Sequence, residues 1–523
     1  MLRYTSTKQI EIFKFEHPFQ TELDPENRWV KLSNLLPWDE LVGIYARSLL
    51  QSKGKYGIDG RLAVGSLIIK HKLGISDREV IETLKENIYL QYFVGFKGFR
   101  KEAAFDSSLL VELRKRMGAE KFDLMNQEII NRSEEVTKVQ KKKAKSDSAR
   151  EGNDTKPKGQ SPTTEGGNSD KQTSKELPNH GKLKIDATVS DQMILYPTDL
   201  GLLNRAREES ERIIDVLYKK TELKKKPRTY RREARKAYLT VTKKRNKSQK
   251  LIRKSIGKQL RYLGRDIKHI HKLLDMFEGK EFPLNKRDQK IFWVIQLLYS
   301  QQEEMYGEKK HSIANRIVNI YQPYVRPIPR GKEKASVEFG AKLGVSEVEG
   351  YVRINNLSWE AYNESSDLKP QVEEYKDQYG YYPEVVLTDK IYLNRNNRNY
   401  LKGLGIRISG KPLGRPPANE SYYKKSKRRK ENNQRNHIEG KFGQGKNAYG
   451  LKCIRARRQD TSESWIAAIF FVMNLVKLIK VADIFCPFFI VLIKEIKLAV
   501  VNLKIYNRIS TYGVQILNYK LVC

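Results

Sequence analysis

The sequence predicts an α/β fold that follows a helical N-terminal region and is interrupted by a basic helical insertion. Residues 1–136 carry apolar side chains at three- and four-residue spacing, which is typical of amphipathic helices. Residues 335–408 alternate between strand-like and helix-like patterns, as α/β sheets do. Between the first predicted strand, at 182–191, and this alternation lies a strongly basic stretch with helical periodicity.

The N-terminal region predicts helices at 61–70 and 76–84. Ser76 followed by Glu79 forms a capping box, which indicates a helix start. The two helices and the short connection around residues 72–75 resemble a helix-turn-helix, a motif that suits DNA docking. An ordinary helical hairpin explains the same pattern equally well. Another helix is expected from residue 106 onward.

Residues 137–182 are rich in Lys, Ser, Gly, Thr and Pro and almost free of apolar side chains. Such a segment cannot bury enough apolar surface to offset the entropy lost on ordering. We therefore expect a disordered polar linker between the N-terminal region and a domain at 183–480.

The helical insertion is expected at about 198–325. Residues 219–268 contain 21 Lys and Arg against three acidic residues, a surplus of 21 − 3 = 18 positive charges. Apolar residues between 252 and 274 form one seam of a long helix, and a partner helix is expected from residue 289. A solvated basic face and an arm that tracks DNA both remain open interpretations.

The second half of the predicted domain supplies its remaining strands. Residues 335–357 read as two strands with a turn at Gly344, followed by a helix at 368–379. The apolar strand at 383–389 ends in Asp389, and a helix and a short strand follow it at 394–403 and 405–408. The tail at 481–523 suggests no role.

The net charge of the chain favours some classes of binding partner over others. With 100 Lys and Arg against 62 Asp and Glu, the net charge is +38, which favours a polyanion such as nucleic acid. An anionic membrane is the weaker alternative, because the clean apolar run at 484–493 is shorter than the roughly 18 residues that span a bilayer. The three scattered cysteines suggest neither a disulfide framework nor a zinc site. A cytoplasmic protein is expected.

Three carboxylates are candidates for catalysis. Asp186 lies within a predicted strand, Asp389 ends another, and Glu439 lies on a later predicted helix; spacing alone leaves Asp191 as an alternative to Asp186. Carboxyl ends of strands are where open α/β sheets place their ligands. Three carboxylates provide hard oxygen ligands for two Mg²⁺ ions, which catalyse phosphoryl transfer in two-metal sites.

The helix that carries Glu439 is also a candidate DNA contact. Offsets of four and seven residues place Arg435, Glu439 and Lys446 on one face. A basic run precedes them, and its position next to Glu439 favours DNA contact over a solvated loop; its members are Lys424, Lys425, Lys427, Arg428, Arg429 and Lys430.

Two rival interpretations are weaker. Residues 440–447 nearly spell a phosphate-binding loop, but Asn447 stands where Ser or Thr is needed to reach Mg²⁺. Trp293 and Trp359 are suited to stack on a flipped base, although tryptophans are more often core residues. We favour the core for both.

The ordered motifs Ile185–Val189, Leu387–Tyr392 and Arg435-x₃-Glu439-x₆-Lys446 resemble the DDE transposases of bacterial insertion sequences. The segment Tyr196–Leu200 and an apolar helix at 470–479 fit the same family. The resemblance covers roughly residues 40–480.

The resemblance implies an RNase H-like mixed sheet with flanking helices. Asp186, rather than Asp191, then joins Asp389 and Glu439 as catalytic residues that bind two Mg²⁺ ions, for which Mn²⁺ can substitute. Arg435 and Lys446 are expected to contact the DNA backbone near the cleaved end.

For the whole protein, the family implies that residues 1–136 bind DNA and that a homodimer assembles on double-stranded DNA, at the element's ends and at the target, in the bacterial nucleoid. The implied activity is binding of terminal inverted repeats, cleavage, and transfer of the 3′-hydroxyl ends to target DNA. A catalytically inactive DNA-binding remnant and a nuclease without strand transfer are the alternatives.

Two departures from the family pattern matter. Asn432 stands where one family variant has Tyr, which predicts a weaker DNA clamp or a relative that has only the Arg, Glu and Lys. Gly440, Gly443 and Gly445 each cost a helix about 1 kcal/mol relative to Ala, which predicts fraying after Glu439.

Overall fold

The computed structural model describes residues 16, 22–47, 57–150, 178–332, 335–409 and 421–481, without the side chains of 136–150, 330–336 and Lys424. The chain forms two compact units. The first comprises 1–113, 121–173 and 471–523, and the second comprises 114–120 and 174–470. Apart from Val481, the predicted tail lies outside the described residues.

The first unit contains a group of short helices: α1 (Arg28–Leu35), α2 (Trp38–Ala46), α3 (Gly60–Leu73), α4 (Asp77–Glu86) and α5 (Ile88–Phe93). The buried Arg61 joins three of them. Its guanidinium donates to the Phe93 carbonyl at 3.0 Å and to Ser33 Oγ at 2.6 Å, and it lies over the Trp38 ring at 4.7 Å. Buried polar groups need such partners, so Arg61 fixes how α1, α3 and α5 pack.

The two helices predicted at 61–70 and 76–84 are present as α3 and α4. Gly74, at φ 68°, ends α3 in the left-handed conformation that glycine adopts without strain. Ser76 Oγ accepts the Glu79 N–H at 3.2 Å, as the capping pattern predicts. The connection is further fixed by an ion pair of 2.7 Å between the buried Lys70 and Asp77.

Helix α6 (Leu109–Arg150) differs from the expectation of a linker that begins at residue 137. Residues 137–150 are helical, while 151–177 lie outside the described residues. The extension consists largely of Lys, Ala, Gln and Arg, which have high helix propensity. The absence of apolar residues was therefore a poor guide to where the helix ends.

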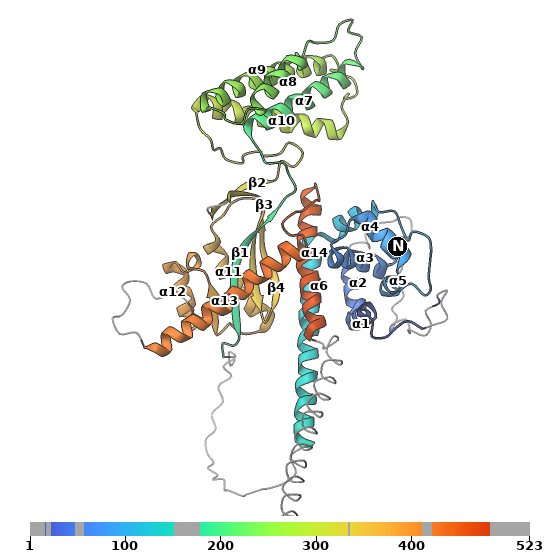
Figure 1. Ribbon diagram of the computed structural model, residues 1–523, viewed down its shortest axis with the longest axis vertical. Helices are drawn as coiled ribbons and strands as arrows, with labels where there is room; N and C mark the ends of the chain where they lie inside the picture. The colour runs from blue at the N-terminus through green and yellow to red at the C-terminus, as the bar shows by residue number, and fades with distance from the viewer. Residues whose placement is uncertain are drawn as a thin grey trace, which may run out of the picture. The chain divides into compact units, whose positions relative to one another are not determined.

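The second unit contains a mixed sheet, which confirms the α/β class (Figure 1). Its strands are β1 (Lys182–Asp191), β2 (Arg326–Lys332), β3 (Ala335–Val348), β4 (Tyr351–Ser358), β5 (Val385–Thr388) and β6 (Arg407–Ile408). The order is β2-β3-β1-β5-β6, with β4 also paired to β3. Strand β1 runs antiparallel to β3 and parallel to β5.

The predicted turn at Gly344 is wrong, because β3 continues through this residue at a bulge. The chain reverses instead at Glu349 and Gly350, which have φ of 50° and 90°. Gly344 instead permits a close approach, because a Cβ there would collide with the carboxylate of Asp367. Sequence periodicity alone does not distinguish a glycine that makes a turn from one that permits a close approach.

Between β1 and β2 the chain forms four helices, α7 (Asp199–Tyr218), α8 (Arg231–Thr242), α9 (Gln249–Asp275) and α10 (Lys286–Glu308). Their shared apolar core includes Leu203, Ile213, Leu263 and Ile295, all fully buried. Because this one seam is apolar, most of the surplus Lys and Arg side chains remain on the outside.

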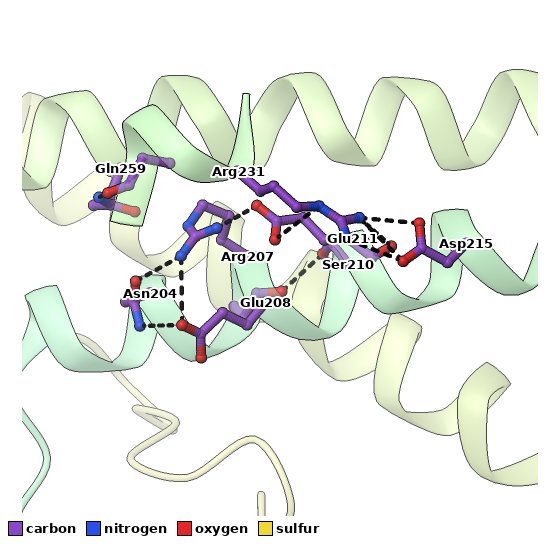
Figure 2. A network of polar contacts seen from close by, with 10 residues as sticks. Asn204, Arg207, Glu208, Ser210, Glu211, Asp215, Arg231 and Gln259 are labelled. Carbon is purple, nitrogen blue, oxygen red and sulfur yellow. Dashed lines mark hydrogen bonds and ion pairs between the residues drawn. The ribbon is translucent and has the colours of Figure 1, made fainter. Parts of the chain in front are cut away.

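A polar network lies inside this helical insertion (Figure 2). Arg207, with 1 % of its surface exposed, donates to Asn204 Oδ1 at 2.8 Å and to the carboxylate of Glu211. Nearby, Arg231 pairs with Asp215 at 3.0 Å, which joins α8 to α7. These contacts compensate charges that would be costly to bury alone.

The remaining elements complete the second unit and lead out of it: 3₁₀ turns at Glu364–Asp367 and Lys390–Tyr392, and helices α11 (Leu368–Tyr379), α12 (Arg395–Gly403), α13 (Tyr422–Ala448) and α14 (Gln459–Val481). Leu183 and Ile185 of β1 pack with Val372 and Tyr375 of α11, which covers one face of the sheet near Asp186.

Among the described residues, α14 alone is long and apolar enough to cross a membrane by length and composition. However, 72 % of its most apolar window is buried inside the protein, as in the core helix of a soluble protein. The apolar run at 484–493 lies outside the described residues.

Candidate active site

Two of the three predicted carboxylates, Asp186 and Asp389, occupy corresponding positions on β1 and at the end of the neighbouring β5. Ile185 of β1 is paired in parallel register with Thr388, the last residue of β5. Asp186 and Asp389 come directly after this pair and therefore lie at the same level of the sheet. Asp389 is exposed and caps the 3₁₀ turn, because its Oδ1 accepts the Lys390 N–H at 2.7 Å.

The third carboxylate comes from α13, which packs against both β1 and β5 and crosses the sheet (Figure 1). Lys182 Nζ at the start of β1 donates to Gln434 Oε1 on this helix at 3.0 Å. Ile438 is fully buried, whereas the neighbouring Glu439 side chain is 52 % exposed. Helix α13 thus buries Ile438 on one face and carries Glu439 on a more exposed face.

The predicted fraying after Glu439 is wrong. Helix α13 continues through all three glycines to Ala448. Ile438 and Phe442, one turn apart, are both buried, and this burial offsets the poor helix propensity of the glycines. Residues 440–447 are therefore helical, so the segment that nearly matches a phosphate-binding loop does not form a loop.

Arg435 lies between two of the carboxylates. Its Nη2 is 2.8 Å from Glu439 Oε1, one helical turn away, and its Nη1 is 3.7 Å from Asp186 Oδ2. The cation thus links α13 to β1 at the candidate site and balances charge that would otherwise repel.

The environment of Asp186 is unusual for a carboxylate. Its side chain is 16 % exposed, and burial raises its pKa to about 6. The Ala187 N–H, at 2.9 Å, and Arg435 oppose this shift, whereas the carboxylates of Glu439 and Glu364 reinforce it. A further cation beside Asp186, in addition to Arg435, would therefore stabilise its charged form.

The chemistry of this donor set suits Mg²⁺, which prefers carboxylate oxygen. Within the described ranges, however, no group of three or more His, Cys, Asp or Glu side chains is arranged to hold a metal ion. Asp186, Asp389 and Glu439 share one region of the second unit but do not form a closed cage. Asp191 is five residues beyond Asp186 on β1, so it projects to the opposite face and is the poorer candidate.

Sequence reasoning missed several residues near Asp186. Glu364 begins a 3₁₀ turn and pairs with Lys342 at 2.9 Å. Tyr392 is fully buried, and its hydroxyl has no hydrogen-bond partner among the described residues. Burial raises the pKa of Tyr392, and the carboxylates of Glu364 and Asp186 add to the shift. The sequence signal that could have identified Tyr392 is its position three residues after Asp389.

The predicted basic run lies in the first turns of α13. Lys425, Lys427, Arg429 and Lys430 are exposed and Arg428 is half-buried, while the side chain of Lys424 is not described. Tyr422 and Tyr423, which precede the run, are 86 % and 72 % exposed. Exposed aromatic rings beside cations are typical of nucleic-acid surfaces, and sequence analysis overlooked both tyrosines. Lys446 is half-buried.

Helix α4 is poorly suited to reading DNA. It carries four acidic residues against Arg78 and Lys85, a net charge of 2 − 4 = −2. Phosphates would be repelled by this helix, which favours the ordinary helical hairpin over a helix-turn-helix at residues 61–86.

Trp359 and Trp293 differ in how much of their surface is exposed. Trp359 is 7 % exposed and donates Nε1–H to Glu463 at 2.7 Å, so the core interpretation is confirmed for it. For Trp293 that interpretation is wrong, because 58 % of its surface is exposed on α10.

Comparisons with known proteins identify two family domains. Residues 386–476, which contain Asp389, Arg435 and Glu439, match the transposase DDE domain. Residues 17–116 match a transposase domain (DUF772). An uncharacterized protein, ORF8 in the nfe locus of Rhizobium meliloti, is 37 % identical over 99 residues, which are 18 % of this chain and 46 % of that protein. The match thus spans about half the length of that relative. No solved structure matches the chain.

Proposed function

We propose that this chain, two parts of which match transposase domains, is an insertion-sequence DDE transposase that binds the terminal inverted repeats of its element, cleaves the DNA there and joins the 3′-hydroxyl ends to target DNA. Asp186, Asp389 and Glu439 are the proposed catalytic residues. The observation that carries this proposal is the link through Arg435 between Asp186 on β1 and Glu439 on α13.

The sheet supports an RNase H-like core. The central strand β1 carries Asp186 and lies between an antiparallel neighbour, β3, and a parallel neighbour, β5, whose end supplies Asp389. Two carboxylates at one level of a mixed sheet, with a third on a helix that crosses it, are the arrangement that the family implies.

Asp186, Asp389 and Glu439 would hold the divalent metal, which supplies charge stabilisation during phosphoryl transfer. Arg435 holds Glu439 through an ion pair of 2.8 Å and would contact the phosphate backbone of bound DNA. The exposed cations at 425–430 and the exposed rings of Tyr422 and Tyr423 would position the DNA beside this site. Both ends of an element must be brought together, so we propose a homodimer on double-stranded DNA.

The test is a cell-free reaction on a supercoiled plasmid that carries the gene with its native flanking DNA. Wild-type protein is incubated with Mg²⁺, with Mn²⁺ and with chelator, beside Asp389→Asn and Glu439→Gln proteins. We expect metal-dependent breaks at the borders of the element and joined products, both absent with either variant. Breaks without joined products would indicate a nuclease that lacks strand transfer. Salt-sensitive binding without breaks would indicate a DNA-binding remnant, and breaks that survive both substitutions would refute the assignment of the carboxylates.

A further inference from the structure

A cleft of about 1180 Å³ lies in the second unit between the start of α10, the segment at 320–324 and the start of α14. We call it the insertion cleft, and its lining includes Arg287, Lys290, Tyr321, Tyr324, Arg457 and Glu463. We propose that the insertion cleft binds a single-stranded segment of DNA, with phosphates at its cations and a base on Tyr321. This inference rests on the proposed function and adds a second DNA-binding site to it.

The charge of the insertion cleft suits phosphate. It is lined by Arg287, Lys290, Arg457 and Arg458 against two acidic residues, a net charge of 4 − 2 = +2. Both acidic residues already have partners: Asp460 pairs with Arg458 at 2.7 Å, and Glu463 accepts the Trp359 N–H at 2.7 Å. The exposed Arg287, Lys290 and Arg457 therefore dominate the field inside the cleft.

Two helix starts add to this field. Helix α10 begins at Lys286 and α14 at Gln459, and residues in the first turns of both line the insertion cleft. The N-terminal end of a helix carries partial positive charge and attracts phosphate. Each first turn also holds an acidic residue, Asp288 in α10 and Asp460 in α14, which pair with Arg212 and Arg458. The helix starts therefore add less to the field than the exposed cations do.

The aromatic side chains of the insertion cleft are held in place. Tyr321 is 45 % exposed, and its hydroxyl donates to Glu209 Oε1 at 2.6 Å, which fixes the ring. Tyr324 packs edge-on against the buried Trp359, with ring centroids 4.5 Å apart. A fixed, exposed ring beside cations is the combination with which proteins bind single strands without sequence preference.

The insertion cleft is also joined to the strand that carries Asp186. Gln192, just past the end of β1, donates to the Ala456 carbonyl and to Ser462 Oγ at 3.2 Å, next to the residues that line the cleft. Gln192 is six positions after Asp186, which corresponds to about 20 Å along an extended strand. A strand in B-form DNA rises about 3.4 Å per nucleotide, so roughly six nucleotides cover that distance, and an extended single strand needs fewer. A single strand of a few nucleotides can therefore reach from Asp186 to the residues beside the insertion cleft.

The experiment measures binding of a fluorescent 20-nucleotide single strand and of a duplex to the full-length protein over a salt series. The cleft variant replaces Arg287, Lys290 and Arg457 by Ala. The matched control replaces three exposed cations of α8, Arg232, Arg235 and Lys236, which do not line the cleft. We expect the cleft variant to bind the single strand at least tenfold more weakly, with a salt slope lower by about two, since each lost phosphate contact removes roughly 0.7.

A second pair of variants tests the aromatic contact. Tyr321→Ala should weaken single-strand binding about tenfold, whereas Tyr321→Phe keeps the ring and should change it little. Trp293→Ala removes an exposed ring that does not line the cleft and should leave binding unchanged.

The outcomes separate the two proposals. If wild type cuts at the element's borders but the cleft and α8 variants bind the single strand equally well, the insertion-cleft proposal is wrong and the proposed function stands. A wild-type protein that neither binds nor cuts DNA would overturn both. Circular dichroism and thermal unfolding confirm that each variant is folded before it is compared.

Discussion

The Arg435 guanidinium lies 2.8 Å from the carboxylate of Glu439 and 3.7 Å from that of Asp186. One side chain thus balances two of the three carboxylates that we propose bind metal. A metal ion and this guanidinium would compete for the same oxygens, so Arg435 stabilises the metal-free site. On metal binding its donors become available for a phosphate, which arginine recognises well.

The competition predicts that Arg435→Gln binds divalent metal more tightly than wild type does. We expect a three- to fivefold gain in Mn²⁺ affinity by calorimetry or by electron paramagnetic resonance, because a partly exposed ion pair is worth at most about 1 kcal/mol. DNA binding should weaken in the same variant. Arg429→Gln, in the exposed basic run, is the matched control and should leave metal affinity unchanged. Weaker metal binding by Arg435→Gln would show that the guanidinium supports the metal site rather than competing with it.

Asp186 and Asp191 give a second test, because they lie on opposite faces of β1. Asp186→Asn should lower metal-dependent DNA cleavage by more than about 100-fold, since loss of even an outer contact to a metal ligand costs 10- to 100-fold. Asp191→Asn should cleave within a fewfold of wild type. Both proteins should bind DNA as wild type does in a gel-shift assay. Equal loss of cleavage in the two variants would contradict the choice of Asp186, rather than Asp191, as the catalytic residue.

The features that sequence predicted well are those that local pattern determines. Periodicity located β1, α9, α10 and α11 because burial of one face leaves a repeat in the chain, whereas α8 was not predicted. Gly344 and Trp293 were misjudged because their roles depend on residues distant in sequence or on which face of a helix is covered.

The candidate site was only partly predictable for the same reason. Motif order identified Asp389 and Glu439, but nothing in the sequence shows that Glu364 lies close enough to influence Asp186, or that Arg435 lies between two carboxylates. The insertion cleft combines residues 287–291 and 320–324 with residues 457–463, which lie more than 100 residues later in the chain, so it left no local signal.

Gly344 offers a test of the support beneath the site. Gly344→Ala places a Cβ against the carboxylate of Asp367, which accepts hydrogen bonds from Tyr362 at 2.6 Å and Asn356 at 2.9 Å. We expect a loss of about 1–3 kcal/mol in the free energy of unfolding, measured by urea denaturation. Gly443→Ala is the control, because no atom beyond its chain neighbours and the nearby backbone of its own helix lies within 4 Å of the added Cβ. In the middle of α13 it should stabilise the protein by about 0.4–1 kcal/mol. A neutral Gly344→Ala would mean that Asp367 moves aside at no cost.

Asp266 predicts how stability depends on pH. It is fully buried in the helical insertion, and its carboxylate oxygens have no hydrogen-bond partner among the described residues. Burial raises its pKa to about 8, the carboxylate of Glu211 adds to the shift, and the guanidinium groups of Arg207, Arg265 and Arg231 oppose it. In the unfolded chain the group has its ordinary pKa near 3.8.

Between about pH 4 and pH 8 the folded protein therefore binds a proton at Asp266 that the unfolded chain does not. The contribution of this proton is fully present below pH 4 and is lost as the pH rises toward 8. Asp266→Asn carries no such titration, so it should gain stability over wild type across this window, on the order of a few kcal/mol at pH 8. Thermal unfolding of the two proteins from pH 4 to pH 9 measures the difference. Asp275→Asn, at the exposed end of the same helix, is the control and should follow wild type. If the Asp266→Asn and wild-type curves stay parallel, the carboxyl group does not remain protonated in the folded protein.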